Sequence, residues 1–92
     1  EYKFNDCVNI TQLLFDFYLP DYNIAIEFDG IQHFVPKDYF GGVDGYNKII
    51  KNDEIKNKYC DLNNIKLIRI AYNENIEMIL GKYFWYFILS YL

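Results

Sequence analysis

The fold of this chain is decided by residues 15–33, which read FDFYLPDYNIAIEFDGIQH. They predict two strands, residues 13–19 and 24–28, joined by a turn at residues 20–23, where Pro fixes φ and Asp and Asn tolerate turn geometry. Each strand carries an acid, and a histidine follows the second strand. Acids inside strands are unfavourable unless something compensates their charge, and a divalent cation is one such compensation.

The four-residue turn also sets the register of the two strands. Leu19 then pairs with Ile24, and Asp16 stands opposite Glu27. Side chains alternate between the two faces of a strand. The expected core face holds Phe15, Phe17, Ile26 and Phe28, and the expected polar face holds Asp16, Tyr18, Ala25, Glu27 and Asp29. Opposed carboxylates repel each other unless they share a cation, so this pair predicts a metal site.

Composition limits the class of protein. The chain has 92 residues, of which 52% are hydrophobic and 21% aromatic, so residues 1–92 are expected to form one folded domain and not a disordered segment. Because it begins at Glu1, we expect a fragment of a longer protein. The net charge of −4 disfavours binding of nucleic acid by bulk charge alone, although acids gathered at a metal site leave a nuclease open.

The cysteines, the N-terminal residues and the apolar C-terminal run bear on where the protein is located. Two cysteines, Cys7 and Cys60, are expected to be reduced core residues. No secretion signal is visible, so an intracellular location is expected. The apolar run at residues 83–92 is far shorter than the roughly 20 residues needed to span a bilayer.

The remaining pattern predicts an α/β fold. A strand is expected at residues 2–8, a loop at 33–44, a helix at 46–62 with its N-cap near Asp44 or Gly45, a strand at 65–71 and a final helix at 76–92. The first helix has the length of a crossover to a parallel strand. The expected architecture is therefore a small mixed sheet with an antiparallel hairpin, a crossover helix and a C-terminal helix.

The pattern of apolar residues on each predicted helix indicates which of its faces are buried. On a helical wheel Asp53 lies inside an apolar arc, which suggests that it points inward; a stripe centred on Ile55, Tyr59 and Leu62 would instead leave it in solvent. The final helix is apolar nearly all round. Such a helix is buried on both sides, which predicts a homodimer or an adjacent domain as its partner.

Five elements of the sequence, taken in order, resemble the PD-(D/E)XK nuclease superfamily. They are Asp16, IAIEFDGIQH at 24–33, FGG at 40–42, NDEIKNKYC at 52–60 and LIRIAY at 67–72. The set is similar to the very-short-patch-repair-like endonucleases and to the phage homing endonucleases named for their EDxHD motif. The resemblance implies a restriction-endonuclease-like fold and Mg²⁺- or Mn²⁺-dependent cleavage of DNA. The Asn-, Lys- and Ile-rich composition suits an AT-rich genome, such as that of a phage or DNA virus.

The resemblance also implies roles for individual residues. Asp16, Glu27 and the backbone carbonyl of Phe28 would hold the metal ion, with Asp29 as a further ligand. The superfamily usually has a lysine where this chain has Asp29. The residues that could take over that role are Gln32, His33 and Lys56, and the resemblance favours His33 as the general base.

Two further positions support this set. Asp53 would orient His33 or bind a second ion, and Lys56 or Arg69 would contact the scissile phosphate. Plainer roles stay open for all of these residues: solvated acids, a turn at residues 29–30, and surface charges. The Tyr and Phe side chains are expected to be mostly core.

Two other functions compete with a nuclease. One is a catalytically inactive nuclease-fold module for DNA binding or oligomerisation, which the lysine replaced by Asp29 and the acidic pI of about 4.8 support. The other is a small protein-interaction domain, which would explain the apolar final helix but not the opposed acids.

Overall fold

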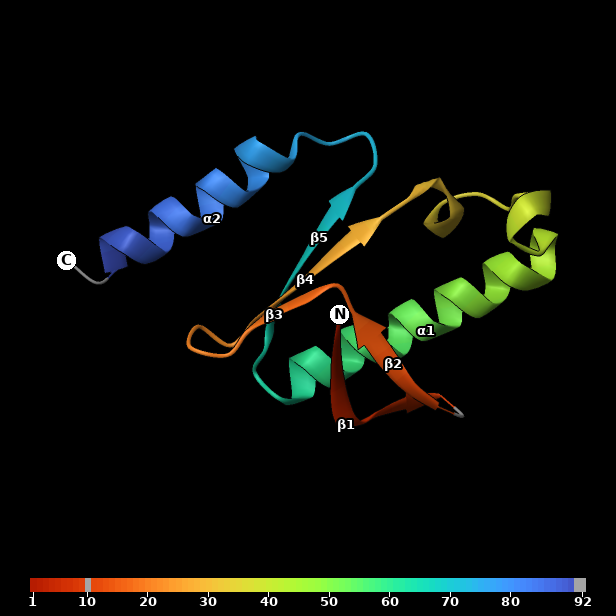
Figure 1. The fold of residues 1–92 in the computed structure, drawn as a ribbon, viewed down its shortest axis with the longest axis horizontal. Helices are drawn as coiled ribbons and strands as arrows, with labels where there is room; N and C mark the ends of the chain where they lie inside the picture. Colours follow the sequence, from red (N-terminus) through yellow and green to blue (C-terminus); the bar gives the residue numbers. More distant parts are fainter. Residues whose placement is uncertain (10, 91–92) are drawn as a thin grey trace.

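The computed structural model describes residues 1–9 and 11–90, with side chains described as far as residue 85, and it shows the predicted mixed α/β class (Figure 1). In chain order the elements are β1 (Tyr2–Asn9), β2 (Thr11–Phe15), β3 (Phe17–Leu19), β4 (Ile24–Asp29), the short 3-10 helices η1 (Ile31–His33) and η2 (Asp38–Phe40), α1 (Gly42–Leu62), β5 (Lys66–Ala71) and α2 (Ile76–Ser90).

Two sheets are formed. β1 and β2 make an antiparallel pair, whereas β4 lies between β3 and β5 in a second sheet. The predicted hairpin register is confirmed, since Phe17 pairs with Ile26 and Leu19 with Ile24. The turn places Asn23 at a φ of 55°, which asparagine tolerates. β5 runs parallel to β4 after the α1 crossover, as predicted.

β4 is buried on both faces, as is usual for a strand paired in parallel between two helices. The first core consists of Cys7, Leu13, Phe15, Ala25, Cys60 and Ile65, against which Ile55 and Tyr59 of α1 pack. The second core consists of Ile24, Ile26, Ile68 and Ile70, against which Ile79, Leu80 and Tyr83 of α2 pack. α1 and α2 therefore cover opposite faces of the second sheet (Figure 1).

The predicted division of the hairpin into one core face and one polar face is wrong. Phe15 is fully buried in the first core, whereas Phe17 and Phe28 are 55% and 37% exposed. The cause is a bend at Asp16, which breaks the predicted strand 13–19 into β2 and β3. The alternation of faces restarts after the bend, so the two halves of the segment serve different sheets.

The aromatic residues are less buried than predicted. Phe15 is in the core, and Phe4, Tyr18 and Tyr59 pack against it. The exposed aromatic side chains are those of Tyr2, Phe17, Tyr22, Phe28, Phe34, Tyr39, Phe40, Tyr72, Phe84 and Trp85. Six of these rings pack in pairs at the surface: Phe17 with Phe28, Phe34 with Tyr72, and Tyr39 with Phe40.

α1 begins at Gly42, earlier than the predicted start at Tyr46, and its cap is Gly41 instead of Asp44 or Gly45. Gly41 and Gly42 have φ angles of 88° and 62°, in the left-handed region that favours glycine. A side chain on Gly45 would collide with the carbonyl of Phe40, so the loop packs directly on the first turn of the helix. The predicted end of the helix at residues 63–64 is confirmed.

α2 presents an uncovered outer face. Met78 and Trp85 are 73% and 63% exposed in the described chain, opposite the residues that pack on the second core. The expected homodimer or adjacent domain on this face stays a prediction, and the part of the predicted helix at residues 91–92 lies outside the described residues. Among the described residues no helix is both long and apolar enough to cross a membrane.

Candidate active site

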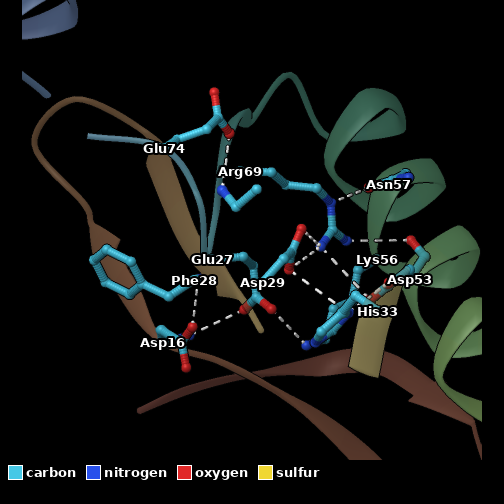
Figure 2. A network of polar contacts seen from close by, with 11 residues as sticks. Asp16, Glu27, Phe28, Asp29, His33, Asp53, Lys56, Asn57, Arg69 and Glu74 are labelled. Atoms are coloured by element: carbon cyan, nitrogen blue, oxygen red, sulfur yellow. Dashed lines mark hydrogen bonds and ion pairs between the residues drawn. The ribbon is translucent and has the colours of Figure 1, made fainter. Parts of the chain in front are cut away.

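Asp16 lies in the bend between β2 and β3, next to β4. Its backbone N–H donates to Oε1 of Glu27 at 3.0 Å, and its Oδ2 accepts from the N–H of Phe28 at 2.7 Å (Figure 2). Asp16 and Glu27 therefore lie close together, as predicted. Their contact is a bond from the Asp16 backbone to the Glu27 side chain, and the two residues are not a pair in the strand ladder. Within the described residues no hydrogen bond engages Oδ1 of Asp16.

Glu27 is only 4% exposed, and its partner is a lysine from α1. The Nζ of Lys56 donates to Oε2 of Glu27 at 3.0 Å and lies 5.2 Å from the centre of the Phe15 ring. Burial raises the pKa of Glu27 above its ordinary value, while the hydrogen bond and charge of Lys56 act in the opposite direction. Burying such a carboxylate costs free energy, and carboxylates with shifted pKa values of this kind are common at functional sites.

The backbone carbonyl of Phe28 points toward Asp16. Along β4 the neighbouring residues bond to β5, because the carbonyls of Asn23 and Asp29 accept from Lys66 and Tyr72. Phe28 has the opposite orientation, since its N–H donates to Asp16. In a strand the N–H and C=O of one residue point to the same side. The geometry thus brings two carboxylates and one carbonyl to the edge of β4 beyond the end of β3.

Asp16, Glu27, Lys56 and the Phe28 backbone form a first polar cluster. A second polar cluster lies next to it, near the carboxyl end of β4, and consists of Asp29, His33, Asp53 and Arg69 (Figure 2). Nδ1 of His33 lies 2.8 Å from Oδ2 of Asp53 and 3.7 Å from Oδ1 of Asp29. The predicted inward orientation of Asp53 is confirmed, because its side chain is only 16% exposed and contacts His33. His33 therefore approaches both acids with the same ring nitrogen, which leaves Nε2 for other contacts.

Arg69 holds this second cluster together. Its Nη1 donates to both carboxylate oxygens of Asp29, at 2.9 and 3.2 Å, and lies 3.5 Å from Oδ1 of Asp53. Its Nε donates to Oδ1 of Asn57 at 3.0 Å. Sequence reasoning assigned Asn57 no role; its place one helical turn after Asp53, on the same face of α1, was the available signal.

Gln32 is near the site but outside both clusters. Its amide group occupies the space next to Gly30 that a side chain at that position would need. Gln32 and Gly30 both line a cleft to which Phe28 also contributes. Among the three candidates for the missing lysine of the superfamily pattern, Lys56 is the residue that contacts Glu27.

The donor set of the first cluster suits a hard cation. Mg²⁺ and Mn²⁺ prefer carboxylate and carbonyl oxygens, and Mg²⁺ sites often use only one or two protein carboxylates, with waters and substrate oxygens completing the shell. Asp16, Glu27 and the Phe28 carbonyl meet that requirement. No group of three or more His, Cys, Asp and Glu side chains in the described chain is arranged to hold a metal ion.

Comparison with known proteins found no relative: no family model, curated protein or solved structure matches the chain.

Proposed function

We propose that the chain is a metal-dependent DNA endonuclease that hydrolyses phosphodiester bonds. The observation that carries this proposal is the convergence of Asp16, Glu27 and Lys56, from three different elements, at the edge of β4. Two acids and a lysine are the residue types of the superfamily pattern. Here the lysine comes from α1, and Asp29 occupies its usual position on the strand.

A Mg²⁺ or Mn²⁺ ion would be held by Asp16, Glu27 and the Phe28 carbonyl. When bound, such an ion neutralises phosphate charge and lowers the pKa of a coordinated water. The chain's own contribution is to keep the two carboxylates in place through the hydrogen bonds of the Asp16 and Phe28 backbone N–H groups. Lys56 favours the charged form of Glu27, because its hydrogen bond and charge oppose the larger effect of burial, which raises the Glu27 pKa.

His33 is the proposed general base, and its geometry supports that role. Asp53 engages Nδ1 at 2.8 Å, which orients the ring and leaves Nε2 to accept a proton from water. Arg69 acts as a positioning residue in this proposal, since its guanidinium is bonded to Asp29 and Asn57 and lies near Asp53. Asp29 belongs to the same second cluster, and in this proposal it does not bind the metal ion.

The competing function is an inactive nuclease-fold module that binds DNA or forms oligomers. One observation favours it: both oxygens of Glu27 already accept hydrogen bonds from the protein. The exposed Met78 and Trp85 on α2 support an additional role for a second copy or an adjacent domain. A homing or repair task belongs to the nuclease proposal and follows from the resemblance alone, whereas a phage or viral origin follows from the composition, and an intracellular place of action from the lack of a visible secretion signal.

Two measurements test the nuclease proposal. Calorimetric titration with Mg²⁺ or Mn²⁺ should show binding that is lost in Asp16→Asn and Glu27→Gln, and both variants should lose DNA cleavage. Metal binding without cleavage in the intact chain would favour the inactive module. His33→Ala tests the base separately, and an unchanged pH profile of cleavage would remove His33 from that role.

A further inference from the structure

A second feature lies beside the candidate active site. It is an open cleft of about 340 Å³ at the carboxyl ends of β4 and β5, the place where ligands bind in many α/β sheets. It is lined by Phe28, Asp29, Gly30, Gln32, Ile70, Ala71, Tyr72, Glu74 and Ile76. Phe28 links the two sites, because its N–H donates to Asp16 and the residue also lines the cleft.

The lining of the cleft suits a flat and partly apolar ligand. Phe28 and Tyr72 are 37% and 57% exposed, and the Tyr72 ring lies 5.9 Å from the ring of Phe34. Exposed rings of this kind stack on nucleobases. Gln32 adds an amide that both donates and accepts hydrogen bonds, which is what reading the edge of a base requires.

The charge of the cleft argues against a phosphate as its occupant. Its described lining contains two acids, Asp29 and Glu74, and neither lysine nor arginine. With a net charge of −4, the chain also gains little from the phosphate backbone of a duplex. Stacking on an aromatic ring needs no positive charge, but it requires the base to be free of its partner strand.

We propose that this cleft binds an unpaired nucleobase, and that the substrate of the proposed nuclease is DNA with a single-stranded segment at the scissile phosphate. The phosphate would lie at Asp16 and Glu27, and the adjoining base would stack on Tyr72 and Phe28. The statement about the substrate rests on the proposed function, whereas the binding of the base does not.

Fluorescence of 2-aminopurine in a single-stranded oligonucleotide tests the cleft without cleavage. Binding should quench the fluorescence, and the single strand should bind more tightly than its perfect duplex. Tyr72→Ala should weaken binding at least about fivefold, the lower limit for one stacked base. Tyr72→Phe should bind like the intact chain. Tyr39→Ala is the matched control, because Tyr39 is 91% exposed, pairs with Phe40 and lies outside the cleft.

A second pair of variants tests the amide. Gly30 has a φ of −69°, which alanine adopts without strain, but a methyl group there would displace the Gln32 amide. Gly30→Ala and Gln32→Ala should therefore weaken single-strand binding in the same way while melting like the intact chain.

The outcomes separate the two proposals. Equal binding of duplex and single strand, or a Tyr72→Ala variant that binds like the intact chain, would overturn the cleft inference and leave the nuclease in place. Quenching that depends on Tyr72, in a chain that cleaves no DNA with Mg²⁺ or Mn²⁺, would remove the nuclease and keep the cleft.

Discussion

The Nζ of Lys56 lies 3.0 Å from Oε2 of Glu27, so a lysine from α1 completes the pair of acids that the β2–β3 bend and β4 bring together. The aliphatic part of this side chain lies in the protein, because only 12% of it is exposed and its amine lies over the Phe15 ring. This contact is the tertiary relationship on which the proposed chemistry depends.

Lys56→Met should abolish most of the cleavage activity, and it should also lower the stability of the fold, because it leaves the buried Glu27 carboxylate without its cation. Methionine retains the apolar stem beside Phe15 but removes the charge, and the loss of one preorganised donor that stabilises a transition state costs on the order of 10²–10³ in rate. Single-turnover cleavage measures the effect. Lys51→Met, on the exposed side of the same helix, is the matched control and should cleave at the normal rate.

The same variant should change metal binding in a way that a structural role alone would not. Lys56 lowers the pKa of Glu27, so its removal should raise that pKa further. Since the metal binds the deprotonated carboxylate, the pH midpoint of Mg²⁺ binding should move upward in Lys56→Met. A midpoint that stays in place would contradict the assigned relationship between the two side chains.

The free energy of unfolding of the Glu27→Gln variant, relative to that of the intact chain, should increase as the pH rises. Burial raises the Glu27 pKa in the folded protein, so between the unfolded and folded pKa values the folded state binds more protons. The stability contribution of Glu27 is present below the unfolded pKa and is lost as the pH rises through the folded pKa. Glutamine does not titrate and keeps the acceptor for the Asp16 N–H.

Urea denaturation at several pH values from 4 to 8 measures this difference. The free energy of unfolding of Glu27→Gln, minus that of the intact chain, should become more positive with increasing pH. A constant difference would show that Glu27 does not titrate differently in the two states.

Arg69→Gln should destabilise the fold. Asp29 is only 6% exposed and Arg69 is its principal cationic partner, so the variant leaves a buried carboxylate without its charge-assisted bonds. The expected loss is about 2–3 kcal/mol in the free energy of unfolding. Lys51→Gln removes an exposed charge from α1 and should change the stability by less than about 0.5 kcal/mol. Equal effects of both substitutions would show that the Asp29–Arg69 pair is not structural.

Cys7 and Cys60 should resist thiol reagents in the folded protein. Both are buried and free, and burial raises the pKa of Cys60 from 9.0 to about 11. Labelling by a disulfide reagent at pH 8 should be slow in native buffer and fast in urea. Rapid labelling of the native chain would show that the first core opens frequently.

The raised thiol pKa values also have a consequence for stability. The folded protein keeps its thiol protons to higher pH than the unfolded chain, so this contribution is present below pH 9 and is lost as the pH approaches about 11. The free energy of unfolding should therefore fall over that range, and Cys60→Ala should reduce the fall.

Much of the fold was predictable because its determinants are local. The turn residues at 20–23, the apolar run of β4 and the break at Asn63–Asn64 depend on chain conformation and on patterns within a few residues. They placed Asp16 beside Glu27 and predicted the parallel β5. The division of faces failed because the bend at Asp16 sends β2 into another sheet, which no local pattern records.

The sequence alone determined the α/β class, the order of the main strands and the two α-helices, the hairpin register and the acids that it brings together. Only the tertiary structure decided which cation serves which acid: Lys56 contacts Glu27, and Arg69 bonds Asp29 and approaches Asp53. The physical reason is that these pairs join residues far apart in the chain. Their contact depends on how α1 and β5 pack against β4, and a charge in a sequence does not reveal its partner until that packing is known.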